Sequence, residues 1–344
     1  MTTQKIRVGI NGAGRIGRAF LKVAHDRPEL EVVAMNDLGS IDNIAYLLKY
    51  DTAYGITPHE ISVKADKSAI IFDGREIAYL SEKDPATLPW GKLNVDVVVE
   101  STGLFTTYEK SQAHLTAGAK KVVISAPVKD EPTGDIKGGT CLLGINEDAI
   151  AGFDISSNAS CTTNAGSPLM AILHETIGIE KALLNTVHGY TASQGIVDGP
   201  NKKDFREGRA AAMNIVPSST GAAIAVTKVL PDLAGKFDGV SMRVPVVVGS
   251  IVDVTFIAKR NTTVEEVNSI LKAAAKEKRW EKSFSVTEEE LVSSDIKGSK
   301  YASIADLAFT RVVDGNLVKV MAWYDNEMGY THTLVEHVVL AGGR

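Results

Sequence analysis

Short apolar runs rich in valine and isoleucine alternate with helix-like segments through the first half of the chain. Residues 5–10 form the first run, and residues 15–25 then place apolar side chains at helical spacing. Further strand-like runs lie at residues 31–35, 95–99 and 121–124. Because these runs are almost continuously apolar, they predict parallel strands buried on both faces. The alternation of strands and helices predicts a doubly wound α/β domain.

The pattern changes after about residue 180. Longer strand-like runs follow one another without regular crossover helices, at residues 181–187, 240–248, 251–258 and 317–323. They predict a second, α+β domain built on a largely antiparallel sheet. Helices are expected within it at residues 221–230 and 263–276. The long polar stretch 191–214 has no periodicity, which is typical of a functional or interfacial loop.

A glycine-rich turn follows the first predicted strand. Gly12, Gly14 and Gly17 form the pattern G-x-G-x-x-G between that strand and the helix. In this context the glycines permit a tight turn, a close approach of a pyrophosphate and close packing of helix on strand. Asp37 ends the second strand, where a carboxylate can accept the ribose hydroxyls of NAD and repel the extra phosphate of NADP. The turn predicts a Rossmann-type dinucleotide site; the alternative is a plain glycine turn with a capping aspartate.

Cys161 lies between a short predicted strand at residues 153–156 and a helical pattern at residues 165–177. A cysteine at a helix N-terminus is a candidate nucleophile, because the helix dipole stabilises its thiolate. The alternative is a small buried core residue. The hydroxyl and amide side chains around Cys161 favour the nucleophile.

A nucleophilic thiol needs a base or an orienting cation, and the chain has seven histidines. His188 ends an apolar strand and enters a loop, which is where catalytic side chains are commonly placed. The other histidines lie in helical or surface-like stretches or near the C-terminus: His25, His59, His114, His174, His332 and His337. The pattern alone leaves the choice among them open.

Composition narrows the class of protein. The 344 residues are 44% hydrophobic and carry a net charge of −5, which suits a globular protein and not a general nucleic-acid binder. No apolar run approaches the length of a membrane span, so a cytoplasmic protein without a membrane partner is expected. Two cysteines exclude a disulfide scaffold, and without a His/Cys cluster no metal site is predicted.

The chain resembles the phosphorylating glyceraldehyde-3-phosphate dehydrogenases over almost its whole length. The matching stretches are residues 10–18, 46–51, 100–103, 124–127, 157–164, 219–223, 242–245 and 323–330. The pair of segments 160–164, Ser-Cys-Thr-Thr-Asn, and 323–327, Trp-Tyr-Asp-Asn-Glu, carries the resemblance most specifically.

The resemblance implies a reaction that serves glycolysis or gluconeogenesis. Cys161 would attack the aldehyde of D-glyceraldehyde 3-phosphate, and His188 would take the proton of the resulting hemithioacetal. Hydride transfer to NAD leaves a thioester, from which inorganic phosphate releases 1,3-bisphosphoglycerate. Thr191 and Arg243 would hold the substrate phosphate. The attacking phosphate would meet Ser160, Thr162, Thr220 and Gly221, assisted by Arg206 or Arg209.

The resemblance also implies the cofactor site and the assembly. The cofactor-binding positions are Gly12, Gly14, Arg15, Ile16, Gly17, Asp37, Lys83, Thr102, Ser125 and Asn326. NAD is the expected cofactor, and because Leu38, Gly39 and Ser40 are small, some use of NADP stays open. The C-terminal helix would return to the first domain, so residues 1–160 plus 325–344 would bind NAD and residues 161–324 would be catalytic. A homotetramer is expected.

Two other functions stay open at this point. A paralogue that oxidises erythrose 4-phosphate would use the same cysteine and histidine. A secondary, non-catalytic role in RNA binding is disfavoured by the acidic net charge. The chain also departs from its relatives at Ala165, at Gly189 and at residues 246–249, where the substrate affinity could differ.

Overall fold

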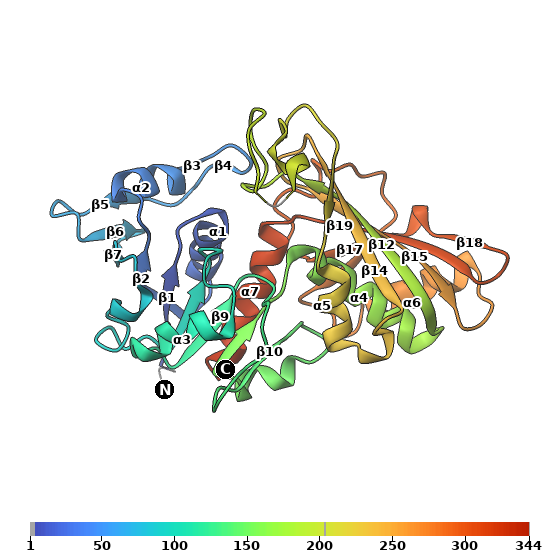
Figure 1. Ribbon diagram of the computed structural model, residues 1–344, viewed down its shortest axis with the longest axis horizontal. Helices are drawn as coiled ribbons and strands as arrows, with labels where there is room; N and C mark the ends of the chain where they lie inside the picture. Colours follow the sequence, from blue (N-terminus) through green and yellow to red (C-terminus); the bar gives the residue numbers. More distant parts are fainter. Residues whose placement is uncertain (1–3, 203, 344) are drawn as a thin grey trace. The chain divides into compact units, whose positions relative to one another are not determined.

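The computed structural model describes residues 4–202 and 204–343. These residues divide into two compact units (Figure 1). Unit 1 comprises residues 4–141, 146–159 and 334–343, and unit 2 comprises residues 142–145 and 160–333 without residue 203. The division falls inside α7 (Met328–Ala341), whereas the boundary expected from the sequence lies at residue 325, just before this helix.

Unit 1 is built on a sheet of nine strands within the described residues. The strand order is β10-β11-β9-β8-β1-β2-β7-β6-β5. Strands β1, β2, β8, β9 and β11 lie at the predicted strand-like runs, whereas β7 and β10 were not predicted. All pairs from β10 to β7 are parallel, as expected. The bounds are β1 (Ile6–Asn11), β2 (Leu30–Asn36), β5 (Ile61–Val63), β6 (Ala69–Phe72), β7 (Arg75–Leu80), β8 (Val97–Glu100), β9 (Lys121–Ile124), β10 (Gly138–Thr140) and β11 (Ile155–Ser157).

Unit 1 also contains helices and several short elements. The predicted helix at residues 15–25 is confirmed as α1 (Arg15–His25). The remaining elements are α2 (Ile41–Lys49), α3 (Tyr108–Thr116), η1 (Pro85–Thr87), η2 (Glu147–Gly152), and the strand pair β3 (Tyr50–Asp51) and β4 (Gly55–Ile56). The pattern missed the antiparallel β6–β7 hairpin, although its Asp73-Gly74 turn is a typical hairpin signal.

Unit 2 is built on a mixed sheet of eight strands in the described part of the chain. The order is β13-β14-β12-β15-β19-β17-β16, with β18 paired to β19. Most pairs are antiparallel, as predicted, but β12 pairs with β14 and β16 with β17 in parallel. The bounds are β12 (Ile179–Gly189), β13 (Val216–Ser219), β14 (Phe237–Val244), β15 (Ser250–Ala258), β16 (Phe284–Thr287), β17 (Ser303–Asp306), β18 (Arg311–Val313) and β19 (Leu317–Tyr324).

The predicted helices of unit 2 are confirmed as α5 (Ala222–Val229) and α6 (Val264–Ala274). Helix α4 (Cys161–Thr176) begins four residues before its apolar pattern, because the Ser160 side chain caps it. Strand β14 ends earlier than predicted, just before Pro245, which has no N–H to donate to a ladder. Short 3-10 helices are η3 (Phe205–Gly208), η4 (Pro231–Leu233) and η5 (Leu307–Phe309).

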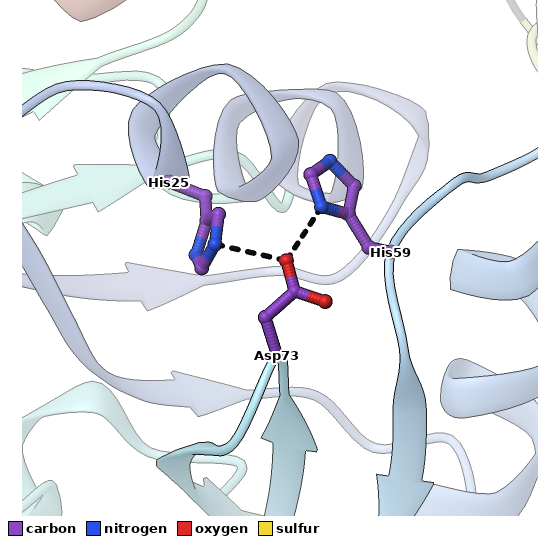
Figure 2. A group of neighbouring side chains, drawn as sticks. All are labelled: His25, His59 and Asp73. Atoms are coloured by element: carbon purple, nitrogen blue, oxygen red, sulfur yellow. Dashed lines mark hydrogen bonds and ion pairs between the residues drawn. The ribbon is translucent and has the colours of Figure 1, made fainter.

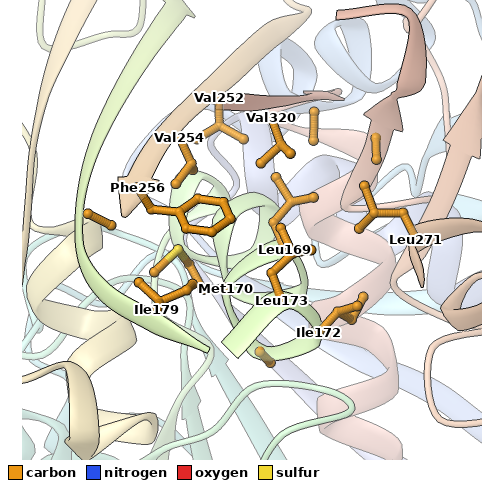
Figure 3. Close-up of a cluster of buried hydrophobic side chains, with 14 of the residues drawn as sticks. Leu169, Met170, Ile172, Leu173, Ile179, Val252, Val254, Phe256, Leu271 and Val320 are labelled. Carbon is orange, nitrogen blue, oxygen red and sulfur yellow. The ribbon is translucent and has the colours of Figure 1, made fainter. Parts of the chain in front are cut away.

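The core of unit 2 lies between the sheet and α4 (Figure 3). Strand β15 alternates strictly, so Val252, Val254 and Phe256 all face inward. They meet the apolar side of α4, where Leu169 and Leu173 are fully buried. Apolar residues recur at every second position of the strand and about every 3.6 positions of the helix. The apolar sides of the two elements therefore pack together as one layer.

Two glycines of the first turn have different surroundings in unit 1. A Cβ on Gly17 would lie 1.9 Å from the carbonyl oxygen of Gly12, whereas a Cβ on Gly14 would meet nothing within 4 Å. Gly12 itself has a φ of 101°, in the region that favours glycine. The third glycine is therefore needed for packing, and the second leaves open space at the start of α1.

We expect Gly17→Ala to destabilise unit 1 by at least ~2 kcal/mol, because the backbone of the turn must move to admit the methyl group. Gly14→Ala should change stability by less than ~1 kcal/mol, since its site is open. Urea unfolding of both variants without added cofactor measures the difference. Equal losses in the two variants would contradict this account of the turn.

Candidate active site

Cys161 is the first residue of α4 in unit 2. The Oγ of Ser160, the capping residue, accepts a hydrogen bond of 3.1 Å from the N–H of Thr163. The residue before the cap, Ala159, is buried and has a left-handed φ of 54°. Non-glycine residues in this conformation are strained, so the surrounding structure must impose the turn that presents Cys161. No sequence pattern indicated this strain.

His188 lies one residue before the end of β12 and is 3% exposed. Its Nε2 lies 3.3 Å from the Sγ of Cys161. The structure therefore brings together the cysteine and the histidine selected from the sequence, although 27 residues separate them along the chain. A thiol and an imidazole in such contact can exchange a proton.

Arg243 is the direct neighbour of His188 in the parallel pairing of β12 with β14. Its Nη1 lies 2.6 Å from the Nδ1 of His188 and 3.3 Å from the carbonyl oxygen of Gly189. The Nδ1 also lies 2.6 Å from that oxygen. Because a guanidinium only donates, its contact favours the tautomer with the proton on Nε2, whereas the Gly189 oxygen favours a proton on Nδ1.

Burial governs the ionisation of the Cys161–His188 pair. Burial, together with the positive charge of Arg243, lowers the pKa of His188 to about 3. Burial also raises the pKa of the Cys161 thiol, against the opposing charge of Arg243 and hydrogen bonds with Thr162. The helix dipole was expected to favour a thiolate, but the loss of hydration outweighs it for the isolated group. A proton passed from Sγ to Nε2 creates two opposite charges in contact, so the pair ionises as a unit.

Tyr324 supports both sides of this site and was not singled out from the sequence. It is buried at the end of β19, and its ring packs edge-on against His188 at a centroid distance of 5.8 Å. Its Oη lies 2.9 Å from the Oγ1 of Thr162 and 2.7 Å from the Oγ1 of Thr186. Burial raises the pKa of its hydroxyl, so Tyr324 remains a neutral positioning group.

The predicted phosphate-binding residues differ in their surroundings. Within the described residues, the Nε of Arg243 is buried without a hydrogen-bond partner, which suits an incoming anion. Thr220 and Gly221 lie at the start of α5, where the Oγ1 of Thr220 accepts from the N–H of Ala222 at 3.2 Å. Thr191 instead bonds Gln194 within its own loop.

Arg206 is not gathered with Cys161 and His188. Its side chain is exposed and forms an ion pair of 2.7 Å with Asp204 in the long loop. Arg209, the alternative at this position, forms its own pair of 2.8 Å with Asp198. Both guanidiniums are therefore engaged by neighbouring carboxylates in this structure.

The two departures near His188 prove to be in contact. A Cβ on Gly189 would lie 2.9 Å from the carbonyl oxygen of Val246, and the N–H of Tyr190 donates to that same oxygen at 3.0 Å. Because the 246–249 loop packs directly on the backbone of Gly189, a larger residue would displace it. Ala165, the third departure, is buried in the core of unit 2.

The other cysteine has a different environment. Cys141 is fully buried in unit 1, and burial raises the pKa of its thiol to about 12. It is therefore an inert core residue, and Cys161 alone combines partial exposure with a histidine contact.

The cofactor residues of unit 1 lie where parallel strands end. Asp37 follows β2, and its carboxylate accepts hydrogen bonds from the N–H groups of Ala13 at 2.7 Å and of Gly39 at 2.8 Å. The start of α1 at Gly14 has no side-chain cap, so its N–H groups can meet an anion in the open space there. The turn therefore fits a dinucleotide.

A buried polar network below this turn was not predicted. Glu100 at the end of β8 accepts from the Nδ2 of Asn11 at 2.6 Å and from the N–H of Thr102 at 2.8 Å. The Nε1–H of Trp90 donates to the Nδ1 of His114, so the Nε2 of His114 carries the proton that bonds Glu100 at 3.0 Å. Contrary to its surface-like sequence context, His114 is fully buried. The network positions Thr102 at the strand ends.

The remaining cofactor candidates are held by local contacts. Arg15 forms an ion pair of 2.8 Å with Asp51. The Ser125 N–H donates to the Glu100 carbonyl at 2.9 Å, and Lys83 is exposed. In unit 2, the Oδ1 of Asn326 accepts from the Gly249 N–H at 3.1 Å and the Ser250 hydroxyl at 3.0 Å. Ile16 lies in the first turn of α1.

Across the described residues, no helix is long and apolar enough to span a bilayer.

Comparison with known proteins gives one consistent result. The family model described as the NAD binding domain of glyceraldehyde 3-phosphate dehydrogenase matches residues 6–108, and that of its C-terminal domain matches residues 160–326. The glyceraldehyde-3-phosphate dehydrogenases of Clostridium pasteurianum and Geobacillus stearothermophilus are 47% and 48% identical, each with 96% of both chains covered. Glyceraldehyde-3-phosphate dehydrogenase 2 of Streptomyces avermitilis is 48% identical over 98% of this chain and 99% of its own.

Acid should destabilise the fold through His188. Its pKa is about 3 in the folded chain and about 6.5 in an unfolded one. Between these values the unfolded chain binds a proton that the folded chain does not, so stability falls as the pH drops below about 6.5. At pH 5 the loss through this residue is about 2 kcal/mol.

We therefore expect His188→Asn to lose about 2 kcal/mol less stability between pH 7 and pH 5 than the parent chain does. Equilibrium urea unfolding at the two pH values measures both losses. The same pH dependence in parent and variant would show that His188 is not buried as a neutral imidazole.

Proposed function

This chain belongs to the glyceraldehyde-3-phosphate dehydrogenase family, and on that premise we propose that it oxidises D-glyceraldehyde 3-phosphate with NAD and inorganic phosphate to 1,3-bisphosphoglycerate. Membership makes it an NAD-dependent oxidoreductase that acts on an aldehyde. The observation that carries the proposal is the 3.3 Å contact between the Sγ of Cys161 and the Nε2 of His188.

In the first step of the proposed reaction, the Sγ of Cys161 attacks the aldehyde carbon and a hemithioacetal forms. The Nε2 of His188 takes the proton of its hydroxyl as the thioester forms on Cys161. NAD supplies the acceptor for the hydride that leaves the same carbon. A phosphate oxygen then attacks the thioester carbon, the C–S bond breaks, and the sulfur recovers its proton from His188.

The start of α4 contributes to these steps. As the first residue of the helix, Cys161 has a backbone N–H without an acceptor inside the helix. That N–H can donate to the oxygen on which charge develops during attack. The nearby hydroxyl of Thr162 is oriented by Tyr324, and in the proposed reaction it would bind the attacking phosphate.

Arg243 couples substrate binding to the base. His188 can accept a proton at Nε2 only when its own proton is on Nδ1, where the Gly189 oxygen can accept it. The Nη1 of Arg243 opposes this tautomer at 2.6 Å. A substrate phosphate that engages the unpartnered Nε and draws the guanidinium away would leave Nδ1 to Gly189. Bound substrate would thus favour the basic form of His188.

The cofactor and phosphate roles are supported to different degrees. The uncapped start of α1 and the carboxylate of Asp37 favour NAD, and the small residues after Asp37 keep some use of NADP open. Thr191 and Arg206 require their present bonds to rearrange before they can hold phosphate. We place the reaction in the cytoplasm, where reducing conditions keep Cys161 a thiol.

The test is NADH formation from glyceraldehyde 3-phosphate and NAD, with and without inorganic phosphate. We expect sustained turnover only with phosphate, and a loss of at least ~10³-fold in Cys161→Ser, because the hydroxyl is a far weaker nucleophile. The matched control Cys141→Ala removes the inert cysteine and should retain turnover. Turnover without phosphate would overturn the proposed reaction, and faster turnover of erythrose 4-phosphate would assign the paralogous substrate.

We also propose that the chain assembles as a homotetramer. Within the described residues of unit 2, the long loop exposes large apolar side chains, among them Ile196 at 86%, Phe205 at 84% and Met213 at 81%. Leu183 on β12 and Val240 on β14 are likewise exposed. Large apolar side chains exposed in such number are typical of a subunit interface.

We expect Phe205→Asp and Met213→Asp together to produce dimers or monomers, because a buried unpaired charge opposes association. Sedimentation equilibrium measures the mass of the assembly. Val313→Asp on β18 removes a comparably apolar, 58% exposed side chain outside the loop and serves as the control. A monomeric parent chain would contradict the proposed assembly.

A further inference from the structure

Three potential metal ligands meet at one edge of unit 1, although the sequence predicted no metal site (Figure 2). His25 is the last residue of α1, His59 lies in the loop after β4, and Asp73 lies in the turn between β6 and β7. None of them belongs to the residues assigned above to the reaction.

The ligand atoms converge on a common point. The Oδ2 of Asp73 lies 2.7 Å from the Nδ1 of His59 and 3.0 Å from the Nε2 of His25. All three ligand atoms lie within 4.8 Å of one another. We propose that His25, His59 and Asp73 bind a divalent transition-metal ion, with zinc as the expected occupant.

The surrounding structure already orients the three side chains. The imidazoles of His25 and His59 both pack on the buried ring of Phe72, at centroid distances of 4.8 and 4.7 Å. Asp73 is clamped to Glu60, because its N–H donates to the Glu60 carbonyl at 2.9 Å and its Oδ1 accepts from the Glu60 N–H at 2.7 Å. The Oδ2 of Asp73 therefore faces the two histidines. Because the three side chains are already held in place, metal binding would cost little side-chain conformational entropy.

The charges suit a cation. One carboxylate and two imidazoles make up the ligand set, and these are the ligand types that zinc accepts. His25 also ends α1, where the helix dipole favours positive charge. The positive charge of Arg75 acts on His25 and opposes the binding of a cation at this site.

Zinc accepts two imidazoles and one carboxylate, with a water in the fourth position of its tetrahedron. The ion would replace the proton of the hydrogen bond between His59 and Asp73, at metal–ligand distances of roughly 2.0–2.2 Å. The Asp73 side chain remains 32% exposed, which leaves a path for the ion and its water. Bound metal would tie the end of α1 to the β6–β7 hairpin.

The test is a calorimetric titration of zinc into the full chain carrying Cys161→Ser, because the parent thiol would itself bind zinc. We expect one ion per chain and a raised melting temperature. X-ray absorption at the zinc edge should show two imidazole nitrogens with oxygen completing the shell. No binding at millimolar zinc, or a shell with fewer than two imidazoles, would overturn the site.

Variants in the same background localise the ion. His59→Gln and Asp73→Asn should each weaken zinc binding by at least ~10-fold, because each removes a ligand. Asparagine tolerates the left-handed φ of 45° at Asp73 and keeps an oxygen for the Glu60 N–H. The matched control Glu76→Gln removes an exposed carboxylate of the same hairpin, which forms an ion pair with Lys64, and should leave the affinity unchanged. Unchanged affinity in both ligand variants would refute the proposal.

Discussion

The contact between the Sγ of Cys161 and the Nε2 of His188 depends on how the sheet of unit 2 is built. β12 places His188 at its end, and α4 begins with Cys161 after a strained, buried turn. Tyr324 packs against the imidazole and bonds the threonines of both elements, so a small shift of any one element would break the contact. In the proposed reaction, the nucleophile and the base would therefore be held by packed secondary-structure elements of unit 2.

Burial governs the protonation of Cys161 and His188. Each group taken alone is held neutral by the loss of hydration, and only a proton exchanged within the pair creates charges that stabilise each other. Arg243, the cross-strand neighbour of His188, and the carbonyl oxygen of Gly189 both contact the Nδ1 of the imidazole and favour opposite tautomers.

Unit 1 also contains buried, hydrogen-bonded polar side chains, which here hold secondary-structure elements in position. Glu100, at the end of β8, bonds Asn11 at the end of β1, His114 in α3 and Thr102 just after β8. At the far strands of this sheet, Phe72 and Glu60 orient a second set of polar side chains that converge on Asp73. In both places apolar packing fixes the directions in which polar atoms point.

The sequence by itself determined the two kinds of sheet, the helices α1, α5 and α6, the glycine turn and the family, because periodicity, close approach and motif spacing are local properties. It also singled out Cys161 and His188. It did not determine the start of α4, the support by Tyr324, the burial of His114 or the meeting of His25, His59 and Asp73. These depend on which residues far apart in the chain become neighbours, and on how much water their contacts exclude, which only the tertiary structure decides.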